Sequence, residues 1–419
     1  MKNATLQAQL EAFTTESALR LSLALSEGAE VPFDVVESTE RGVALYCYRP
    51  RTAEFIRARL GLLAGLPTYA AAARGLEYAP GLTAYLRARG EARIPERERD
   101  RADAALRCFL SRVFAERTEF AFDTARFAAA YAELERCLYD GQWVLEVVTP
   151  ILGLALDPDT PELALGGGLS LIRQTLLGDA PAGLLDGLGP AGVLAVLRLP
   201  QTQPGPTQPA IAEARQRFRT LLTALRLYEP GAFGAGPLGF WRIDGGAWTA
   251  TAIGPVGRLG SLTEIPAAQE DELRGFVNLI ARRVGAASGE VRWALARFEF
   301  GADRRDPYET LTDHLLALRA LLEPEGTASG RLAQRLSVIC APPDERVALA
   351  ERTARAIALE SAVILGEAAG GWRGGMSPED LIAEIGGHLR AILRDVLCGH
   401  LDPDVRALAD ELLAEAAEV

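Results

Sequence analysis

The stretch PYETLTDHLLALRALL, residues 307–322, decides the fold class of the last third of the chain. It is strongly apolar, and Pro307 suits the first turn of a helix. The neighbouring segments have helical periodicity as well. We expect further helices over four segments, namely 273–284, 291–300, 330–340 and 344–365.

A second long helix is expected near the C-terminus. Ser377 is a good helix cap, Pro378 suits the first helical position, and the acids that follow can reach back to the cap. The helix should run to about Cys398 and end at Gly399, and Pro403 should open a short final helix. Residues 263–419 are therefore predicted to be all-helical.

The character of the sequence changes between residues 141 and 262. WVLEVV at 143–148 and VLAVL at 193–197 are short and rich in aliphatic residues, which indicates strands. The glycines at 166–168 fit a hairpin turn, and 201–209 is a proline-rich connection. A helix is expected at 211–228, followed by two more strands at 240–253. This part is predicted to be a mixed α+β module.

Residues 1–140 are mostly helical in pattern, with strands indicated near 33–48. The predicted fold class is mainly α, with a central α+β module and a C-terminal all-α helical bundle. A chain of 419 residues is long enough for two or three domains, and we expect them at 1–140, 141–262 and 263–419.

The charge balance limits the partners that this chain can take. The formal net charge is −12, and the segment from Leu262 onward holds 27 acidic residues against 17 arginines. Most of that surface repels a phosphate polymer, so RNA could bind only at a local basic patch. Of the 44 basic residues only Lys2 is a lysine. Arginine is so common here that one near another residue carries little information.

The sequence also indicates where the protein resides. It has no apolar core of a secretory signal near the N-terminus and no apolar run long enough to span a bilayer. The five cysteines are far apart and odd in number, which argues against a disulfide framework and against a zinc site. We expect a cytoplasmic protein with no membrane contact and no metal.

Three runs in the C-terminal part then suggest a family. They are ALARFEF at 294–300, LTDHLLALRALLEP at 311–324 and RLAQRL at 331–336. Their order resembles the successive helices of the ApeA-like branch of the HEPN ribonuclease superfamily. The resemblance reaches from about residue 143 to the end and is strongest over 294–366. It implies a HEPN-like helical domain at 263–419.

The resemblance also implies a catalytic defect. Where the family has a stretch similar to Leu-Arg-Ser-Lys-Ile-Val-His-Gly, this chain has LESAVILG at 359–366, so Glu360 stands at the arginine position and Leu365 at the histidine position. A third departure is Arg319, at the position of the family's motif glutamate. RNA cleavage by the ribose 2′-hydroxyl needs a proton-transferring group and a fixed cation. Leucine cannot move a proton, and glutamate repels phosphate.

The leading hypothesis is therefore a pseudo-ribonuclease that acts by binding or dimerisation. Family resemblance implies a homodimer packed on the C-terminal helices and a role in bacterial stress response or anti-phage defence. Because sites in this family are composite across a dimer, pairing with a second copy would not restore the missing groups. RNA or a protein is the expected partner.

Two other functions remain open. The first is a metal-independent endoribonuclease that uses Arg394 and His400, which have five residues between them, within the spacing that the superfamily allows. They would converge only if Gly399 ends the helix and lets His400 fold back. The second is a structural oligomerisation scaffold, which would lack a pocket in the central module.

Other motifs carry less information. GAGPLG at 234–239 has the letters of a dinucleotide fingerprint but no helix after it, so no nicotinamide or flavin cofactor is expected. Glu309, Asp313 and His314 share a helix and make at best a partial metal site. We expect this helix to pack in the core of its domain.

Overall fold

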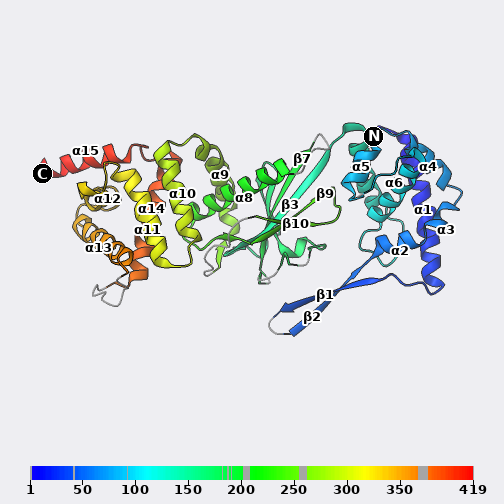
Figure 1. Cartoon of the computed structure of the whole chain (residues 1–419), viewed down its shortest axis with the longest axis horizontal. Coiled ribbons are helices and arrows are strands. Elements are labelled where there is room, and N and C mark those ends of the chain that lie inside the picture. The colour runs from blue at the N-terminus through cyan, green and yellow to red at the C-terminus, as the bar shows by residue number, and fades with distance from the viewer. Residues whose placement is uncertain are drawn as a thin grey trace.

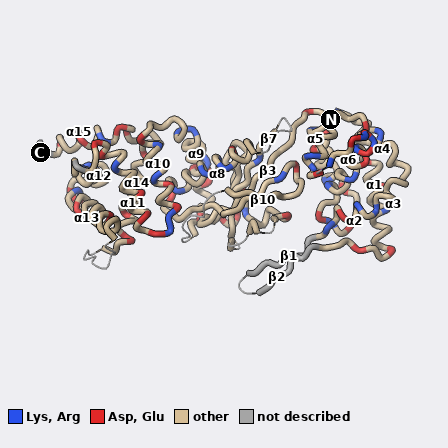
Figure 2. The backbone as a smooth tube through the Cα atoms, viewed as in Figure 1, with Lys and Arg blue, Asp and Glu red and all other residues tan. Residues whose placement is uncertain are grey.

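The computed structural model describes residues 2–40, 43–91, 93–181, 183–185, 188–189, 191–201, 208–253, 262–366 and 376–418, and for residues 34–49 it describes the backbone alone. The chain is laid out along one long axis, with helices at each end and a sheet between them (Figure 1). Acidic and basic residues are interspersed through the helices of both ends (Figure 2).

The N-terminal part is helical with one projecting β-ribbon (Figure 1). Its helices pack around a core of their own, which includes Phe13, Phe55 and Phe109. Its elements are α1 (Ala4–Ser26), β1 (Phe33–Glu40), β2 (Val43–Pro50), α2 (Thr52–Ala58), α3 (Leu60–Ala64), α4 (Tyr69–Glu77), α5 (Leu82–Ala88), α6 (Glu98–Val113), α7 (Thr124–Glu135) and the π-helical turn η1 (Arg136–Asp140).

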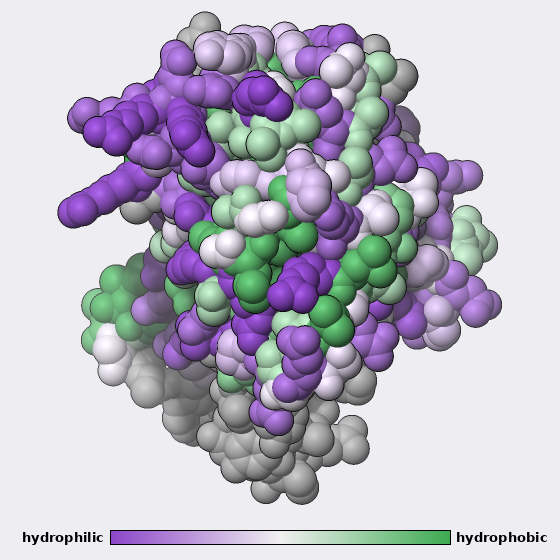
Figure 3. Space-filling model, turned by 90° about the vertical axis from the view of Figure 1, so that its right-hand side faces the viewer, coloured by the Kyte–Doolittle hydropathy of each residue, from purple (hydrophilic) through white to green (hydrophobic). Residues whose placement is uncertain are grey.

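The far end of this part has a mixed surface. Figure 3 views this end and shows hydrophobic residues interrupted by hydrophilic ones. Leu19, Leu62 and Tyr78 are among the exposed large hydrophobic residues. Single exposed apolar side chains of this kind are normal on a soluble surface.

A seven-stranded antiparallel sheet forms the middle of the molecule, in the order β10-β9-β3-β7-β6-β5, with β8 also paired to β3. The elements of this part are β3 (Trp143–Leu152), β4 (Leu154–Leu156), β5 (Glu162–Gly166), β6 (Leu169–Arg173), the 3₁₀ turn η2 (Gln174–Leu176), β7 (Val193–Gln201), α8 (Gln208–Tyr228), β8 (Gly234–Ala235), β9 (Leu238–Ile243), β10 (Thr249–Ala252) and β11 (Thr263–Ile265).

Both faces of the central strand β7 are buried, which explains its continuous aliphatic run. Val193, Ala195 and Leu197 belong to the core on the side of α8, whereas Leu194 and Val196 pack on the opposite face with Leu184. Alternate residues of a strand point to opposite faces, so a strand covered on both sides has no polar alternation.

The described residues from Ala267 to Glu418 form helices and no strand. They are η3 (Ala267–Gln269), α9 (Glu270–Arg283), η4 (Val284–Ala286), α10 (Gly289–Asp303), α11 (Pro307–Leu322), η5 (Thr327–Ser329), α12 (Leu332–Cys340), α13 (Arg346–Ile364), α14 (Pro378–Cys398) and α15 (Val405–Glu418). One continuous core joins the sheet to these helices, from Leu145 to Ala409. The short strand β11 lies just past residue 262 and pairs with β4.

The expected fold class, mainly α with a central α+β module, is wrong. The sheet is not a small insertion, because β3 pairs with β7 over nine positions and with β9 and β8 as well. The fold is α+β. The sequence pattern indicated the main strands, β3 and β7 among them. It did not indicate their pairing, because this pairing joins segments about fifty residues apart and local periodicity carries no information on it. The connection predicted at 201–209 lies mostly outside the described residues.

The arginines of α8 do not all face solvent, although the helix is amphipathic. Arg226 is instead buried, donates to the Phe233 carbonyl, and pairs with Glu299 at 2.9 Å and Asp303 at 2.6 Å. This arginine holds α8 against α10, because a buried guanidinium needs such partners.

Candidate functional site

Glu360, at the expected arginine position, lies on α13 and is buried. Its carboxylate accepts two hydrogen bonds from the Arg319 guanidinium on α11, with nitrogen-to-oxygen distances of 3.0 and 2.6 Å. This is the bidentate geometry that arginine and a carboxylate prefer. Arg319 and Glu360, two of the three positions that the expected resemblance singles out, therefore contact each other across the bundle.

Leu365, at the expected histidine position, is the first residue after α13 and caps the helix end. Its side chain is 73 % exposed, and that of the preceding Ile364 is 69 % exposed. A pair of large aliphatic side chains in solvent offers no group for proton transfer. It offers apolar surface for contact with another molecule.

Arg394 and His400 lie at the end of α14. Gly399 ends this helix with φ of +80°, and the His400 N–H donates to the Asp395 carbonyl at 2.8 Å, so the chain does fold back there. Arg394 forms an ion pair with the neighbouring Asp395, at 3.2 Å, and His400 is exposed. Among the described residues, no hydrogen bond joins Arg394 to His400. The turn that the hypothesis needs exists, but the two side chains are not held together.

Arginines surround the carboxylates of α11. Asp313 accepts from Arg297 at 3.1 Å and from Arg304 at 3.0 Å, and Arg304 also contacts Glu309. Cations therefore occupy the space around both acids. Across the described part of the chain, no group of three or more histidine, cysteine, aspartate or glutamate residues is arranged to hold a metal ion.

A cleft with several charged lining residues lies between the N-terminal helices and the sheet. We call it the junction cleft. It has a volume of about 750 Å³ and is lined by Arg112, Val113, Ala115, Glu116, Arg126, Ala129, Ala130, Gly178, Asp179, Pro181, Arg242, Gly245, Gly246, Ala247 and Trp248. A cleft of this size can hold a small molecule or a short segment of a polymer.

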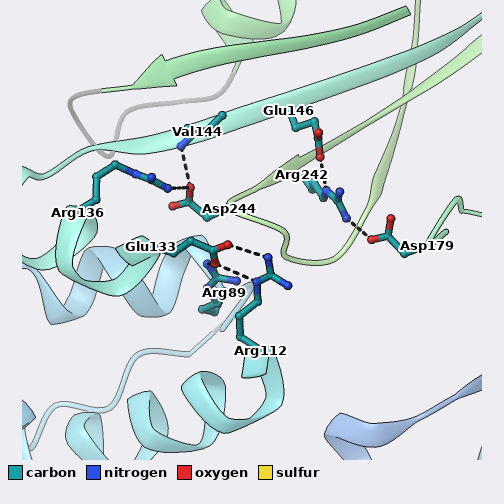
Figure 4. Close-up of polar contacts among 9 residues, drawn as sticks. All are labelled: Arg89, Arg112, Glu133, Arg136, Val144, Glu146, Asp179, Arg242 and Asp244. Atoms are coloured by element: carbon teal, nitrogen blue, oxygen red, sulfur yellow. Dashed lines mark hydrogen bonds and ion pairs between the residues drawn. The ribbon is translucent and has the colours of Figure 1, made fainter. Parts of the chain in front are cut away.

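Arg112 on α6 lines the junction cleft and belongs to a charged triad with Glu133 on α7 and Arg89 at the end of α5 (Figure 4). Arg112 forms a bidentate pair with Glu133 at 2.9 and 2.7 Å, and Arg89 donates to the same carboxylate at 2.9 Å. The hydrogen-bonded Glu133 carboxylate raises the pKa of Arg112. Two guanidinium groups share one carboxylate, so the triad carries one net positive charge.

The opposite wall comes from the sheet. Arg242 on β9 contacts Glu146 on β3 at 2.5 Å and also pairs with Asp179, as Figure 4 shows. Its guanidinium lies 4.1 Å from the centre of the Trp248 ring, and the Trp248 indole donates to the Asp179 carbonyl. These contacts fix a cation and an aromatic ring beside each other in the cleft.

A tight turn at the base of the cleft joins the two walls. Asp244 and Gly245 both have positive φ, and the Gly246 N–H donates to the Ile243 carbonyl, as in a type I′ turn. The Asp244 carboxylate accepts from Val144 N–H at 2.9 Å and from Arg136 at 2.7 Å (Figure 4). Burial raises the pKa of Asp244, although both donors oppose that shift. A side chain at Gly245 would press on Arg112, so the glycine allows the close approach.

Arg126 is the cleft cation that is not neutralised. It is half-buried on α7 and donates to the Ala115 carbonyl at 3.1 Å, and among the described residues it forms no ion pair with a carboxylate. The described lining contains no histidine, cysteine, serine or threonine. The cleft therefore has arginines that can bind an anion, and its other titratable lining groups are the carboxylates of Glu116 and Asp179.

Sequence reasoning did not find the junction cleft. Its residues come from four separated segments, and with 43 arginines in the chain no single arginine was informative. The Asp-Gly pair at 244–245 was the one local signal, because it favours a tight turn.

The described residues include no helix that is long and apolar enough to cross a membrane. Searches against protein-family models, curated proteins and solved structures found no match to this chain.

Proposed function

We propose that this protein is a non-catalytic member of the HEPN-like group that acts in the cytoplasm by binding. Its C-terminal helices form a degenerate ribonuclease domain, and the junction cleft receives an anionic partner. The observation that carries the proposal is the buried ion pair between Arg319 and Glu360. By resemblance, the setting is bacterial stress response or anti-phage defence.

The ion pair supports the resemblance and the loss of catalysis. The resemblance expects an acid on the helix of Arg319 and an arginine at Glu360, and the chain has the opposite charge at each position. Two positions in contact can exchange charges and keep their pairing, whereas unrelated positions have no reason to do so. The exchange leaves a carboxylate where RNA cleavage requires a cation near the phosphate.

The junction cleft supports a binding role over a purely structural scaffold. The cleft is lined by three arginines, Arg112, Arg126 and Arg242, against two carboxylates, Glu116 and Asp179, so it has a small excess of positive charge in an otherwise acidic protein. Trp248 adds an aromatic surface beside the cations. Arginines with an aromatic ring are what proteins use to bind single-stranded RNA, which we take as the anionic partner.

We infer that two copies associate through α13. Val347, Ile364 and Leu365 are large aliphatic side chains, and each is more than two-thirds exposed on this helix or at its end. Light scattering after size exclusion should give twice the monomer mass for the unaltered chain. The double variant Ile364→Glu with Leu365→Glu should give the monomer mass. The control variant Leu19→Glu, which changes an exposed leucine on α1, should keep the dimer mass. If the unaltered chain is monomeric even at high protein concentration, the inference is contradicted.

An RNA cleavage assay tests the loss of catalysis. The purified chain, incubated with labelled single-stranded RNA and a chelator, should leave the RNA intact. Cleavage that survives the chelator and disappears in His400→Ala would overturn the proposal and favour the endoribonuclease that uses Arg394 and His400. The turn at Gly399 is the observation that keeps this second candidate, because it returns the chain toward Asp395, the residue after Arg394.

A binding assay tests the cleft. Arg126→Met should weaken binding of the same labelled RNA several-fold, because it removes the one cleft cation that has no carboxylate partner. Arg57→Met removes an exposed arginine from α2 and serves as the matched control. Equal binding by the two variants would show that the cleft is not the RNA site.

A further inference from the structure

A second cavity lies in the C-terminal helices, at their border with the central part. It has a volume of about 600 Å³ and is enclosed by the loop after α8 and by α10, α11 and α14. We call it the interhelix cavity. Apolar walls come from Phe233, Phe298 and Ile382, and its polar groups include His314 and Arg390. Neither polar group has a role in the function proposed above.

Two glycines hold the His314 ring in place. A side-chain carbon added at Gly301 on α10 would lie 2.8 Å from His314 Cδ2. One added at Gly386 on α14 would lie 2.6 Å from Cε1. Both distances are shorter than real carbon contacts allow, so the imidazole fills the space that the two glycines leave. The ring is fixed between the two helices.

His314 has an unused polar atom. The residue is 8 % exposed, and its Nδ1 atom is buried with no hydrogen-bond partner among the described residues. Burial lowers the pKa of His314 to about 4, so the ring is neutral at neutral pH and offers one donor and one acceptor. A buried nitrogen without a partner is unfavourable. Because His314 lines the cavity, its ring reports on a molecule that binds there.

Arg390 is an underused cation on the same wall. It follows Gly386 by one helical turn, which places both on one stripe of α14. Its guanidinium is half-buried, and its one hydrogen bond goes to the Tyr228 carbonyl at 3.5 Å, near the limit for such a bond. Burial and the neighbouring Arg394 lower the pKa of Arg390. Arg226, in the same cavity, is by contrast paired with two carboxylates.

We propose that the interhelix cavity binds a small organic monocarboxylate. Its carboxylate lies on the Arg390 guanidinium, and its apolar body packs against Phe233 and Phe298, beside the His314 ring. One guanidinium matches one carboxylate in a bidentate pair. Glu379 and Asp380 also line the cavity, and their charges disfavour a doubly charged phosphate.

The three histidines of the chain allow a direct test. Protein labelled with ¹⁵N-histidine is titrated with acetate, butyrate and benzoate, and the ring nitrogen signals are followed by NMR. His388→Gln and His400→Gln assign the His314 signals. Benzoate should shift these signals in a saturable way and bind more tightly than acetate, because it fills the apolar part of the cavity.

Two variants locate the binding. Gly387→Leu should abolish the shift, since Gly387 lines the cavity and an added Cβ there would meet no atom within 4 Å, which leaves room for the larger side chain to occupy the cavity. Gly275→Leu, at an equally open glycine on the exposed side of α9, is the matched control and should bind as the unaltered chain does. If Gly387→Leu does not fold, Gly387→Ala should still weaken binding. Arg390→Met should weaken benzoate binding by about tenfold or more.

Three results would overturn the inference. They are the absence of a His314 shift with all three acids, an undiminished shift in the Gly387 or Arg390 variants, and an equal shift with inorganic phosphate. The RNA assays described above do not involve this cavity, so the two proposals fail or stand separately.

Discussion

At the scale of single residues, the pair between Arg319 and Glu360 is the most informative contact in the chain. The Glu360 side chain is 5 % exposed and that of Arg319 is 16 % exposed. Removing one member of such a pair leaves the other charge buried without a partner, which costs more than the pair itself contributes. The contact therefore constrains both positions together.

A charge exchange tests this coupling. Glu360→Gln should lower the free energy of unfolding by about 3 kcal/mol, and Glu360→Arg by at least as much. The double variant Arg319→Glu with Glu360→Arg should recover at least half of that loss, measured by denaturant unfolding. Glu351→Gln removes an exposed pair from the same helix and should change the free energy by less than about 0.5 kcal/mol. Additive effects of the two single changes would contradict the coupling.

His314 should make stability depend on pH. Burial lowers its pKa from 6.5 in the unfolded chain to about 4, so the unfolded state binds more protons between these values. Stability is then lost as pH falls from 6.5 to 4, by about 3 kcal/mol in total for this group, and is unaffected by it above 6.5. Unfolding curves of the unaltered chain and of His314→Gln should converge as pH falls through that window. His400→Gln, at an exposed histidine, should keep the full pH dependence.

At the scale of helices and strands, much of the structure follows from local signals. Ser377 accepts from the Asp380 N–H at 3.0 Å, Pro378 lies in the first turn of α14, and Gly399 ends the helix, all as predicted. The hairpin at 166–168 is also confirmed, because β5 and β6 pair across it. Caps and turns depend on a few neighbouring residues, so their signals survive in a single sequence. The short strands β4, β8 and β11 have no such signal and were missed.

The hairpin glycines offer a prediction at this scale. Gly168 has φ of +81°, and an added side-chain carbon would lie 2.2 Å from the Arg198 carbonyl oxygen. Gly90 has the same φ of +81° and open space around it. Gly90→Ala should therefore lower the free energy of unfolding by only about 1–2 kcal/mol, which is the strain of an alanine in the left-handed backbone conformation. Gly168→Ala should cost about 1–3 kcal/mol more, because β5, β6 and β7 must move apart. Equal losses in thermal or denaturant unfolding would show that the hairpin yields without strain.

At the scale of the whole molecule, the sequence was least informative. The helical ends and the strands of the middle were indicated, but the seven-stranded sheet depends on pairing between distant segments. The junction cleft depends on how the N-terminal helices meet that sheet, which no local pattern encodes. Glu360, Leu365 and Arg319 could be named from the sequence because the expected resemblance aligns them with motif positions. The contact between Arg319 and Glu360 could not be predicted from the sequence, since the two residues are 41 positions apart.

The two main cores predict how the molecule unfolds. The N-terminal helices have one core, and the sheet shares the other with the C-terminal helices. Leu318→Ala on α11 should speed hydrogen exchange in β7 as well as α14 but leave α1 unchanged. Phe109→Ala on α6 should speed hydrogen exchange in α1 but leave β7 and α14 unchanged. Both side chains are fully buried, so each change should cost about 3 kcal/mol or more. Faster exchange in all three parts in either variant would indicate a single cooperative unit.

The basic residues drawn in Figure 4 determine how these contacts respond to alkaline pH. Every cation among them is a guanidinium, and this group keeps its proton until pH values above about 12. An ammonium group in the same places would begin to lose its charge near pH 10. The attachment of the N-terminal helices to the sheet through Arg136 and Asp244 is thus one that alkali does not loosen.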